Sequence, residues 1–542
     1  MQARRVFHFV GLSLLYASLI GCGGRVEKGK RVIRYSGSSV GAEGRVLKRQ
    51  IGRFETLHPN ITVELQPTPD AADQSHQLYV EWLNSGSGRP DVLQLDVVWT
   101  PELAAAGWIQ PVPRGVTEGE SFLPEALAAN RWRERLYGVP LFVDVGMLYW
   151  RTDLLANPPT TYAELETMAK KALSQREVRY GMVWQGARYE GLVTVFLEHA
   201  IGFGGGILAP DGSLAVNSQG SRRALAFMRR EIDTGIVPRS ALGWHEEQTR
   251  FAFQNGDALF MRNWPYAYPL MEDGARSAVA GRFAVAPMPA GPGERTVAAL
   301  GGAELAVNAH SRHPGAAWAL VRFLTQPAQL VERAKIAGEY PPLPALYRSG
   351  RLEGLLPIAP QRALGIISHA TARPATPVYA QLSSDLQVEL HRALSGQSGT
   401  DEALASAAVA MRATLARVHQ KAKRAGPASS LLLAALGSIA LLVLFLLYAR
   451  RMRSRDAGPG PGSRVPRREE RLGWLLSLPA IGVVAGVALF PLGWTFWESL
   501  HAHDLRMPWK GEPFVGLEQY ASIAASGRFW SAMAHTAVFT VV

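Results

Sequence analysis

The residue types that support catalysis occur in this chain without the spacing that most catalytic sites need. His245-Glu246-Glu247 lacks the second histidine of a helical zinc motif, and the glycine-rich stretch 202–206 lacks the Lys-Ser/Thr that completes a phosphate-binding loop. His501-Ala502-His503-Asp504 lies in a segment expected to be a loop, a weak context for a metal site. We therefore expect no metal site and no cofactor, and we expect that the chain is not an enzyme.

The single cysteine, Cys22, follows a segment with the features of an export signal. Arg4 and Arg5 form a positive start, and the mostly apolar stretch 6–20 leads into Leu19-Ile20-Gly21-Cys22. This apolar stretch is short for a membrane span but suits a signal peptide. The ending resembles the lipobox of bacterial lipoproteins. The resemblance implies removal of most of segment 1–22 and acylation of Cys22.

The chain is too long for one core, and its positive charge is concentrated in one place. At 542 residues, at least two packed units are expected. The formal net charge is +12, and segment 450–471 holds eight arginines against three acidic residues. This segment lies between two apolar runs, so it is typical of a cytoplasmic loop. We expect no nucleic acid as a partner.

Strand and helix patterns alternate from residue 31 to about residue 420. Strands are predicted at 32–35, 61–65 and 91–95, and the apolar residues Val46, Leu47, Ile51 and Phe54 recur at helical spacing between the first two strands. Further strands are predicted near 136–140, 146–150, 283–287 and 305–307, and helices at 161–173, 316–324, 327–335 and 401–423. This order predicts an α/β fold with a parallel or mixed sheet. Ligands bind such sheets beyond the carboxyl ends of the strands.

Long uncharged runs follow residue 427 and predict a membrane anchor. Segments 428–449 and 472–496 are each long enough to span a bilayer, and a third apolar run begins at 532. We predict a signal peptide at 1–22, an exported domain at 23–427 and a cytoplasmic linker at 450–471. Segment 472–542 would then hold a second transmembrane helix, an outer loop and the start of a third. The expected location is the bacterial inner membrane, with the exported domain on its periplasmic or extracellular side.

Several segments, in a fixed order, resemble the carbohydrate-binding proteins of ABC importers. These segments are 54–63, 85–92, 95–102, 106–108, 136–140, 144–155 and 253–258. Two more, Met261-Arg262-Asn263-Trp264-Pro265-Tyr266 and Ala372-Arg373-Pro374-Ala375-Thr376-Pro377, look like the trehalose/maltose-binding branch. The resemblance implies a two-lobed, hinged clamshell of the periplasmic-binding-protein class (type II-like), which binds a di- or oligosaccharide.

Carried across residue by residue, the resemblance implies a set of saccharide contacts. They are Glu43, Asp96, Phe142, Asp144, Trp264, Gly302 and Arg373. Carboxylates accept hydrogen bonds from hydroxyls, a guanidinium donates them, and an aromatic face covers the apolar side of a sugar ring. Each residue also has a purely structural interpretation as a helix cap, turn, core or ion-pair residue. The branch often has an aromatic residue where Ala303 follows Gly301-Gly302, so the sugar stays open.

The C-terminal part resembles a second family, the membrane subunits of the same importers. The resemblance rests on Arg471-Leu472-Gly473-Trp474, Leu478-Pro479-Ala480, Phe490-Pro491, Glu498-Ser499-Leu500 and the stretch 514–520. It implies a start of a permease fused to the binding domain. A second permease subunit and cytoplasmic ATPase subunits are the implied partners.

Two other functions fit parts of the sequence. A secreted glycosidase could use a carboxylate pair such as Asp96 and Asp144. A membrane-anchored sugar sensor could use the same exported domain, but it would need a signalling domain after the membrane spans.

Overall fold

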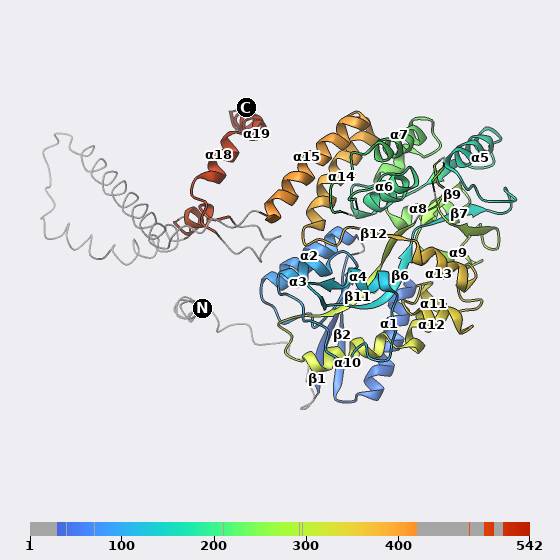
Figure 1. Cartoon of the computed structure of the whole chain (residues 1–542), viewed down its shortest axis with the longest axis horizontal. Helices are drawn as coiled ribbons and strands as arrows, with labels where there is room; N and C mark the ends of the chain where they lie inside the picture. Colours follow the sequence, from blue (N-terminus) through green and yellow to red (C-terminus); the bar gives the residue numbers. More distant parts are fainter. Residues whose placement is uncertain are drawn as a thin grey trace, which may run out of the picture. The chain divides into compact units, whose positions relative to one another are not determined.

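The computed structural model describes residues 30–38, 41–69, 71–209, 211–291, 293–294, 296, 298–419, 476, 491, 493–502 and 513–541 (Figure 1). The chain divides into two compact units. The first is built from the segments up to residue 97, 109–185 and 234–372, and the second from 98–108, 186–233 and the segments from residue 373 onward. Each unit therefore combines segments that are distant in the sequence.

The larger sheet of the first unit is mixed, as the alternation of strands and helices predicts. Its strand order is β12 (Thr371–Ala372), β11 (Ala299–Val307), β3 (Val92–Asp96), β1 (Arg31–Gly37) and β2 (Ile61–Pro67), and β6 (Val139–Val145) also pairs with β11. β1 runs parallel to β2 and β3, whereas β11 runs antiparallel to β3 and β6. β11 thus joins the N-terminal strands to β6.

The first β-α-β unit follows directly from the apolar pattern. Helix α1 (Gly41–Leu57) connects β1 to β2 and buries Val46, Leu47, Ile51 and Phe54, as the helical spacing predicts. These side chains belong to the main apolar core or to a small cluster beside it. Burial of such side chains contributes about 1.5–3 kcal/mol each, before conformational entropy is subtracted. The core therefore fixes the start of α1 beside the sheet.

A second sheet and short helices complete the first unit. The second sheet has the order β10 (Phe283–Ala286), β7 (Met147–Arg151), β9 (Ala258–Asn263) and β8 (Tyr180–Val183), and β4 (Arg131–Trp132) pairs with β5 (Arg135–Leu136). The helices of this unit are α1, α2 (Ala72–Asn84), α4 (Pro124–Ala129), α5 (Tyr162–Ser174), η1 (Arg239–Gly243), α8 (Glu246–Gln254), α9 (Ala267–Met271), α10 (Pro314–Leu324), α11 (Pro327–Ala337), α12 (Pro344–Arg348) and α13 (Pro360–Ser368).

The second unit is helical in its described residues. Its helices are α3 (Thr100–Ala105), α6 (Glu190–Gly202), α7 (Gln219–Asp233), α14 (Tyr379–Ser395) and α15 (Thr400–His419), followed by α18 (Glu518–Ala524) and α19 (Gly527–Val541). Helices α6, α7, α14 and α15 pack against one another. α15 buries Leu404, Ala408 and Met411.

Most of the segments predicted to meet the membrane lie outside the described residues. These include 1–22 with Cys22, 428–449, 450–471 and most of 472–496. Among the helices that the structure does describe, none combines the length and the apolar character needed to cross a bilayer. The predicted spans and the lipid anchor therefore stay predictions.

Gly302, on β11, pairs with Val143 of β6. Its φ is +121°, and a Cβ at this position would lie 2.3 Å from the carbonyl oxygen of Phe142. The register of β11 with β6 shifts between Ala303 and Glu304, which identifies a β-bulge. Only glycine adopts this backbone without strain and without a clash.

We predict that Gly302→Ala destabilises the chain, because it adds backbone strain of about 1–3 kcal/mol and a steric clash. The matched control is Gly52→Ala in α1, where a Cβ would meet nothing within 4 Å. The control should be neutral or more stable by up to about 1 kcal/mol, since alanine favours helices. Denaturant unfolding measures both. Equal stability of the two variants would contradict the strain at Gly302.

Candidate functional site

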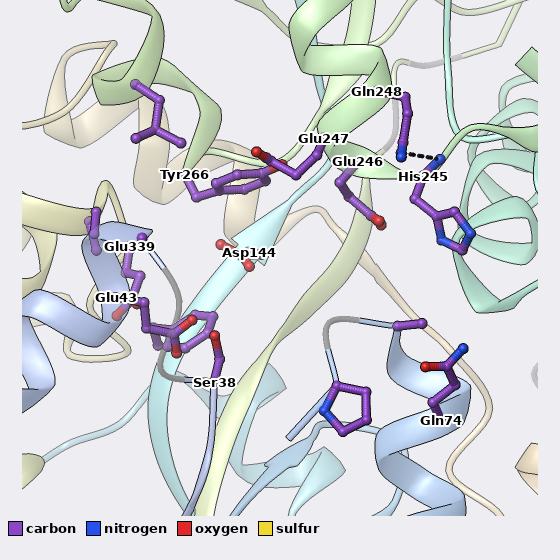
Figure 2. Close-up of a pocket in the computed structure, with 17 residues that line it drawn as sticks. Ser38, Glu43, Gln74, Asp144, His245, Glu246, Glu247, Gln248, Tyr266 and Glu339 are labelled. Carbon is purple, nitrogen blue, oxygen red and sulfur yellow. Dashed lines mark hydrogen bonds between the residues drawn. The ribbon is translucent and has the colours of Figure 1, made fainter. Parts of the chain in front are cut away.

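A pocket of about 630 Å³ lies in the first unit, and three of the predicted contacts line it. These are Glu43, Phe142 and Asp144. The other polar or aromatic residues that line it are Ser38, Gln74, His245, Glu246, Glu247, Gln248, Tyr266 and Glu339 (Figure 2). Carboxylates dominate the lining, so the pocket offers mainly hydrogen-bond acceptors.

The larger sheet brings four predicted residues to one region of β11. Ala303 pairs with Asp96 of β3 on one side and with Phe142 of β6 on the other. Gly301 pairs with Asp144, and Gly302 pairs with Val143. Asp96 and Gly302 are not among the residues that line the pocket, although they lie on strands beside residues that do.

Trp264 lies next to this region but is not among the lining residues. A Cβ at Gly301 would meet the Trp264 ring at 3.2 Å and Asp144 Cβ at 3.4 Å. The Tyr149 hydroxyl donates to the Trp264 carbonyl oxygen at 2.7 Å, which fixes the backbone after β9. The Arg262 guanidinium lies 3.9 Å from the ring centroid, so it covers one face of the indole.

Asp144 is a buried acceptor whose ionised form is disfavoured by its surroundings. Its Oδ1 atom is shielded from solvent and has no hydrogen-bond partner among the described residues. Burial raises the pKa of the Asp144 carboxyl well above its ordinary value, and the carboxylates of Glu339 and Glu43 raise it further. Arg262 opposes the rise. A ligand that donates a hydrogen bond to Asp144 would satisfy an atom that the protein itself leaves without a partner.

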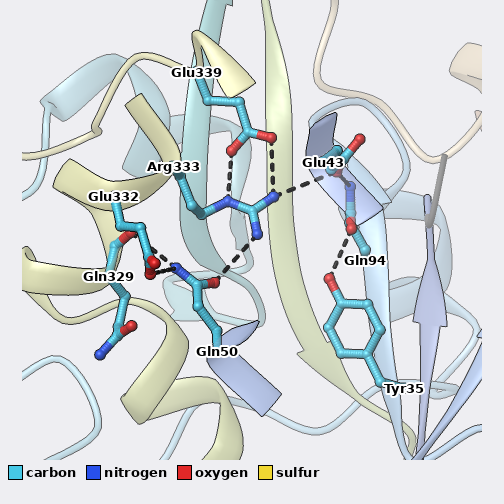
Figure 3. Close-up of polar contacts among 8 residues, drawn as sticks. All are labelled: Tyr35, Glu43, Gln50, Gln94, Gln329, Glu332, Arg333 and Glu339. Atoms are coloured by element: carbon cyan, nitrogen blue, oxygen red, sulfur yellow. Dashed lines mark hydrogen bonds and ion pairs between the residues drawn. The ribbon is translucent and has the colours of Figure 1, made fainter. Parts of the chain in front are cut away.

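Glu339 lines the pocket beside Glu43, and sequence reasoning missed it. It follows Gly338, whose φ of +73° ends α11, and its carboxylate forms two hydrogen bonds with Arg333 (Figure 3). Burial raises the pKa of Glu339 to about 7, with a further rise from Glu43 and opposition from Arg333. The position directly after a helix C-cap was the one local signal that Glu339 lies in a turn.

The pocket is also lined by Glu247, on α8, and by Tyr266, in the turn after β9. Sequence reasoning missed both residues. The Tyr266 hydroxyl donates to Glu247 Oε1 at 2.8 Å. Arg250 holds the same carboxylate through two contacts, of 3.0 and 2.5 Å. Acidic residues in the first turn of a helix are common caps, so the sequence alone did not distinguish Glu246 and Glu247 as pocket residues.

Arg373 lies in the second unit, where it forms a buried ion pair. Its Nη1 atom donates to Glu190 Oε1 at 2.8 Å, and the two side chains are 2% and 9% exposed. Tyr379 and Ser383 also donate to Glu190. Burial raises the pKa of Glu190, and Arg373 opposes the rise. The structural contact that sequence analysis allowed for Arg373 is therefore present, but in the interior and not at the surface.

Comparison with known proteins assigns this chain to a class. Residues 50–353 match the family model of bacterial extracellular solute-binding proteins. A probable ABC transporter-binding protein of Deinococcus radiodurans is 35% identical over 359 residues, which cover 63% of this chain and 84% of that protein. The structure of maltose-bound MalE3 of T. maritima matches with a TM-score of 0.68 and 36% identity, over 71% of this chain and 99% of that one.

These matches define a binding protein with the two-lobed α/β fold of maltose-binding-like proteins, as the sequence predicts. The chain belongs to the family of bacterial extracellular solute-binding proteins. A separate, shorter likeness links it to the trehalose/maltose transport system permease protein MalF of Thermococcus litoralis. That match is 38% identical over 80 residues, which are 15% of this chain and 26% of the permease.

We predict that Asp144→Asn relieves part of a pH-dependent loss of stability in the ligand-free chain. The folded pKa lies above the ordinary 3.8, so the stabilising contribution of Asp144 is present in acid and is lost as pH rises through the folded pKa. The free energy of unfolding falls by about 1.4 kcal/mol for each unit by which the folded pKa of Asp144 exceeds its unfolded pKa. Unfolding at pH 4 and pH 8 should show a smaller difference for the variant. The same difference in both proteins would contradict the prediction.

We also predict that Glu190→Ala destabilises the chain by roughly 3–5 kcal/mol, because it leaves Arg373 buried without its carboxylate. The double variant Glu190→Ala/Arg373→Ala should lose less than the sum of the two single variants. Lys170→Ala, which breaks an exposed pair with Glu166, is the control and should cost under about 1 kcal/mol. If the losses in the free energy of unfolding of the two single variants simply added up in the double variant, the ion pair would not contribute to stability.

Proposed function

We propose that the chain is the carbohydrate-binding component of an ABC importer and that its ligand is a di- or oligosaccharide of the maltose or trehalose type. The observation that carries the proposal is the pocket in which Glu43, Asp144 and Glu339 meet the rings of Phe142 and Tyr266. Sugar hydroxyls supply the donors that carboxylates need, and aromatic rings cover the C–H face of a sugar. The maltose in the T. maritima relative and the likeness to a trehalose/maltose permease support this ligand class.

The saccharide contacts belong to the same proposal. Glu43 and Asp144 accept hydrogen bonds from hydroxyls, and Phe142 covers an apolar sugar face, which their positions in the pocket lining support. Gly302 lets β11 approach β6 closely enough to present Asp144. Asp96, Trp264 and Arg373 complete the proposed set of contacts.

The proposed topology places the binding domain outside the cytoplasm. Segment 1–22 directs export, Cys22 carries the lipid, and the domain at 23–427 holds the pocket. Segments 428–449 and 472–496 cross the inner membrane on either side of the cytoplasmic linker 450–471, whose arginines favour that side. Segment 472–542 is then the start of a permease, which acts with a second permease subunit and cytoplasmic ATPase subunits.

Covalent attachment would change how the importer captures its ligand. A binding domain tethered beside its permease has a high effective concentration, so delivery does not depend on diffusion of a separate protein. A permease that starts in the cytoplasm and a domain that ends outside need one extra crossing between them. The uncharged segment 428–449 supports that role.

We predict that the full chain in detergent binds maltose or trehalose with one-to-one stoichiometry and releases no hydrolysis product. Titration calorimetry measures the binding, and chromatography of the recovered sugar detects products. Phe142→Ala should weaken binding by about tenfold, because it removes an aromatic contact of roughly 1.5 kcal/mol. Leu57→Ala, at a side chain that is 66% exposed on α1, is the control and should bind as the parent does.

Two results would contradict this function, and a third would contradict only one of its contacts. Sugar cleavage by the chain would favour a hydrolase. Binding of none of maltose, trehalose and sucrose would remove the proposed ligand class. Unchanged affinity in Phe142→Ala would remove the aromatic contact, although sugar binding itself would stand.

A further inference from the structure

One buried guanidinium lies directly behind the wall of the pocket. Arg333, on α11, is 1% exposed, and its Nε and Nη2 atoms contact the two oxygens of Glu339 at 2.5 and 3.0 Å (Figure 3). The same Nη2 atom lies 3.4 Å from Glu43 Oε1. The guanidinium therefore contacts two carboxylates at once, with a bidentate geometry to one of them.

The groups around Arg333 come from separate elements of the first unit. Glu43 belongs to α1, Glu339 to the connection after α11, and Phe142, whose ring centroid lies 5.9 Å from the guanidinium carbon, to β6. All three line the pocket, whereas Arg333 is not among the lining residues. Arg333 is thus placed to act on a ligand through other side chains.

Glu43 accepts a second hydrogen bond besides the contact with Arg333. Gln94 Nε2 donates to Glu43 Oε1 at 2.7 Å, and the Tyr35 hydroxyl donates to Gln94 Oε1 at 2.7 Å. Arg333 also reaches Gln50 Oε1 at 3.5 Å. Both donors to Glu43 meet the Oε1 atom, so Oε2 lies outside these contacts on a side chain that is 21% exposed.

A purely structural ion pair would not need this arrangement. Buried ion pairs add little net stability, and apolar residues of similar volume often replace them without loss. One carboxylate would balance Arg333, yet two approach it, and both line a pocket. Carboxylates that are fixed before the ligand arrives lower the entropic cost of binding.

We propose that Arg333 is a positioning residue for saccharide binding, which holds Glu43, Glu339 and Phe142 as one preorganised wall of acceptors and aromatic surface. The inference rests on the proposed function, and it assigns to Glu339 the role of an additional acceptor for sugar hydroxyls. Arg333 itself does not touch the ligand.

Electrostatics give this role a signature that packing alone would not produce. Four titratable or charged groups surround Glu339, each from a different element. They are Arg333 of α11, Glu43 of α1, Asp144 of β6 and Tyr35 of β1. The Glu339 pKa of about 7 is raised by burial and lowered by Arg333. Hydroxyl donors favour the ionised carboxylate, so saccharide affinity should increase as pH rises through about 7. Removal of the Arg333 charge should move this midpoint to higher pH.

The test is a titration of the full chain in detergent with maltose and trehalose between pH 5.5 and 8.5. Arg333→Gln should weaken binding at pH 7 by about tenfold or more and shift the midpoint upward. Arg333→Lys keeps the charge but not the bidentate fork, so it should weaken binding with little shift of the midpoint. Glu339→Gln keeps the shape of the side chain and should flatten the pH dependence near 7.

The matched control is Arg151→Lys. Arg151 makes a bidentate contact with Asp153 in the same unit, outside the pocket lining, and the substitution should leave affinity and midpoint unchanged. If both Arg333 variants bound saccharide with the affinity and the pH midpoint of the parent chain, the inference would be overturned. If the Arg333 variants do not fold, a parental pH profile in Glu339→Gln would overturn it instead. Failure of the parent chain to bind either sugar would overturn the proposed function first.

Discussion

The Arg333 guanidinium contacts the carboxylates of both Glu43 and Glu339, and at Glu339 it opposes the rise in pKa that burial causes. Without such compensation, buried carboxylates take up protons and cease to be pure acceptors. The raised pKa values of Glu339 and Asp144 show that the compensation is incomplete. A ligand that donates hydrogen bonds would favour the ionised forms of both carboxylates.

The sheet supplies the geometry on which this electrostatic balance depends. β11 pairs with β3 and β6 at once, so residues from three distant segments of the sequence meet at one place. At Gly302 the backbones of β11 and β6 lie too close for a Cβ, and the register of the two strands shifts just beyond, between Ala303 and Glu304. Because α1 starts beside the same sheet, Glu43 reaches the pocket from a fourth segment.

Local pattern was enough to predict the β1–α1–β2 unit, where apolar spacing fixes both the helix and its buried face. Glu43, Phe142 and Asp144 were named from family resemblance and not from local pattern; they line the pocket, and their contact with a saccharide stays a prediction. Local pattern could not predict Glu339 as a pocket residue, because only long-range packing brings the residue after α11 beside α1. Arg333 lies in a helix segment whose neighbours Glu332 and Lys335 are charged, so nothing local distinguishes it from a surface residue. Burial of a charge is decided by tertiary contacts that sequence spacing does not contain.

The lining supports the proposal of a polyhydroxylated ligand over that of a simple cation. Glu43 and Glu339 accept hydrogen bonds, while the amides of Gln74 and Gln248 can donate them (Figure 2). His245 donates its backbone N–H to Gln248 Oε1 at 3.1 Å, which fixes the amide oxygen and leaves the Nε2 end as the donor. A hydroxyl donates and accepts at the same time, so a ring with several hydroxyls can meet both kinds of group. A cation would satisfy the carboxylates but would place positive charge beside amide donors that need acceptors.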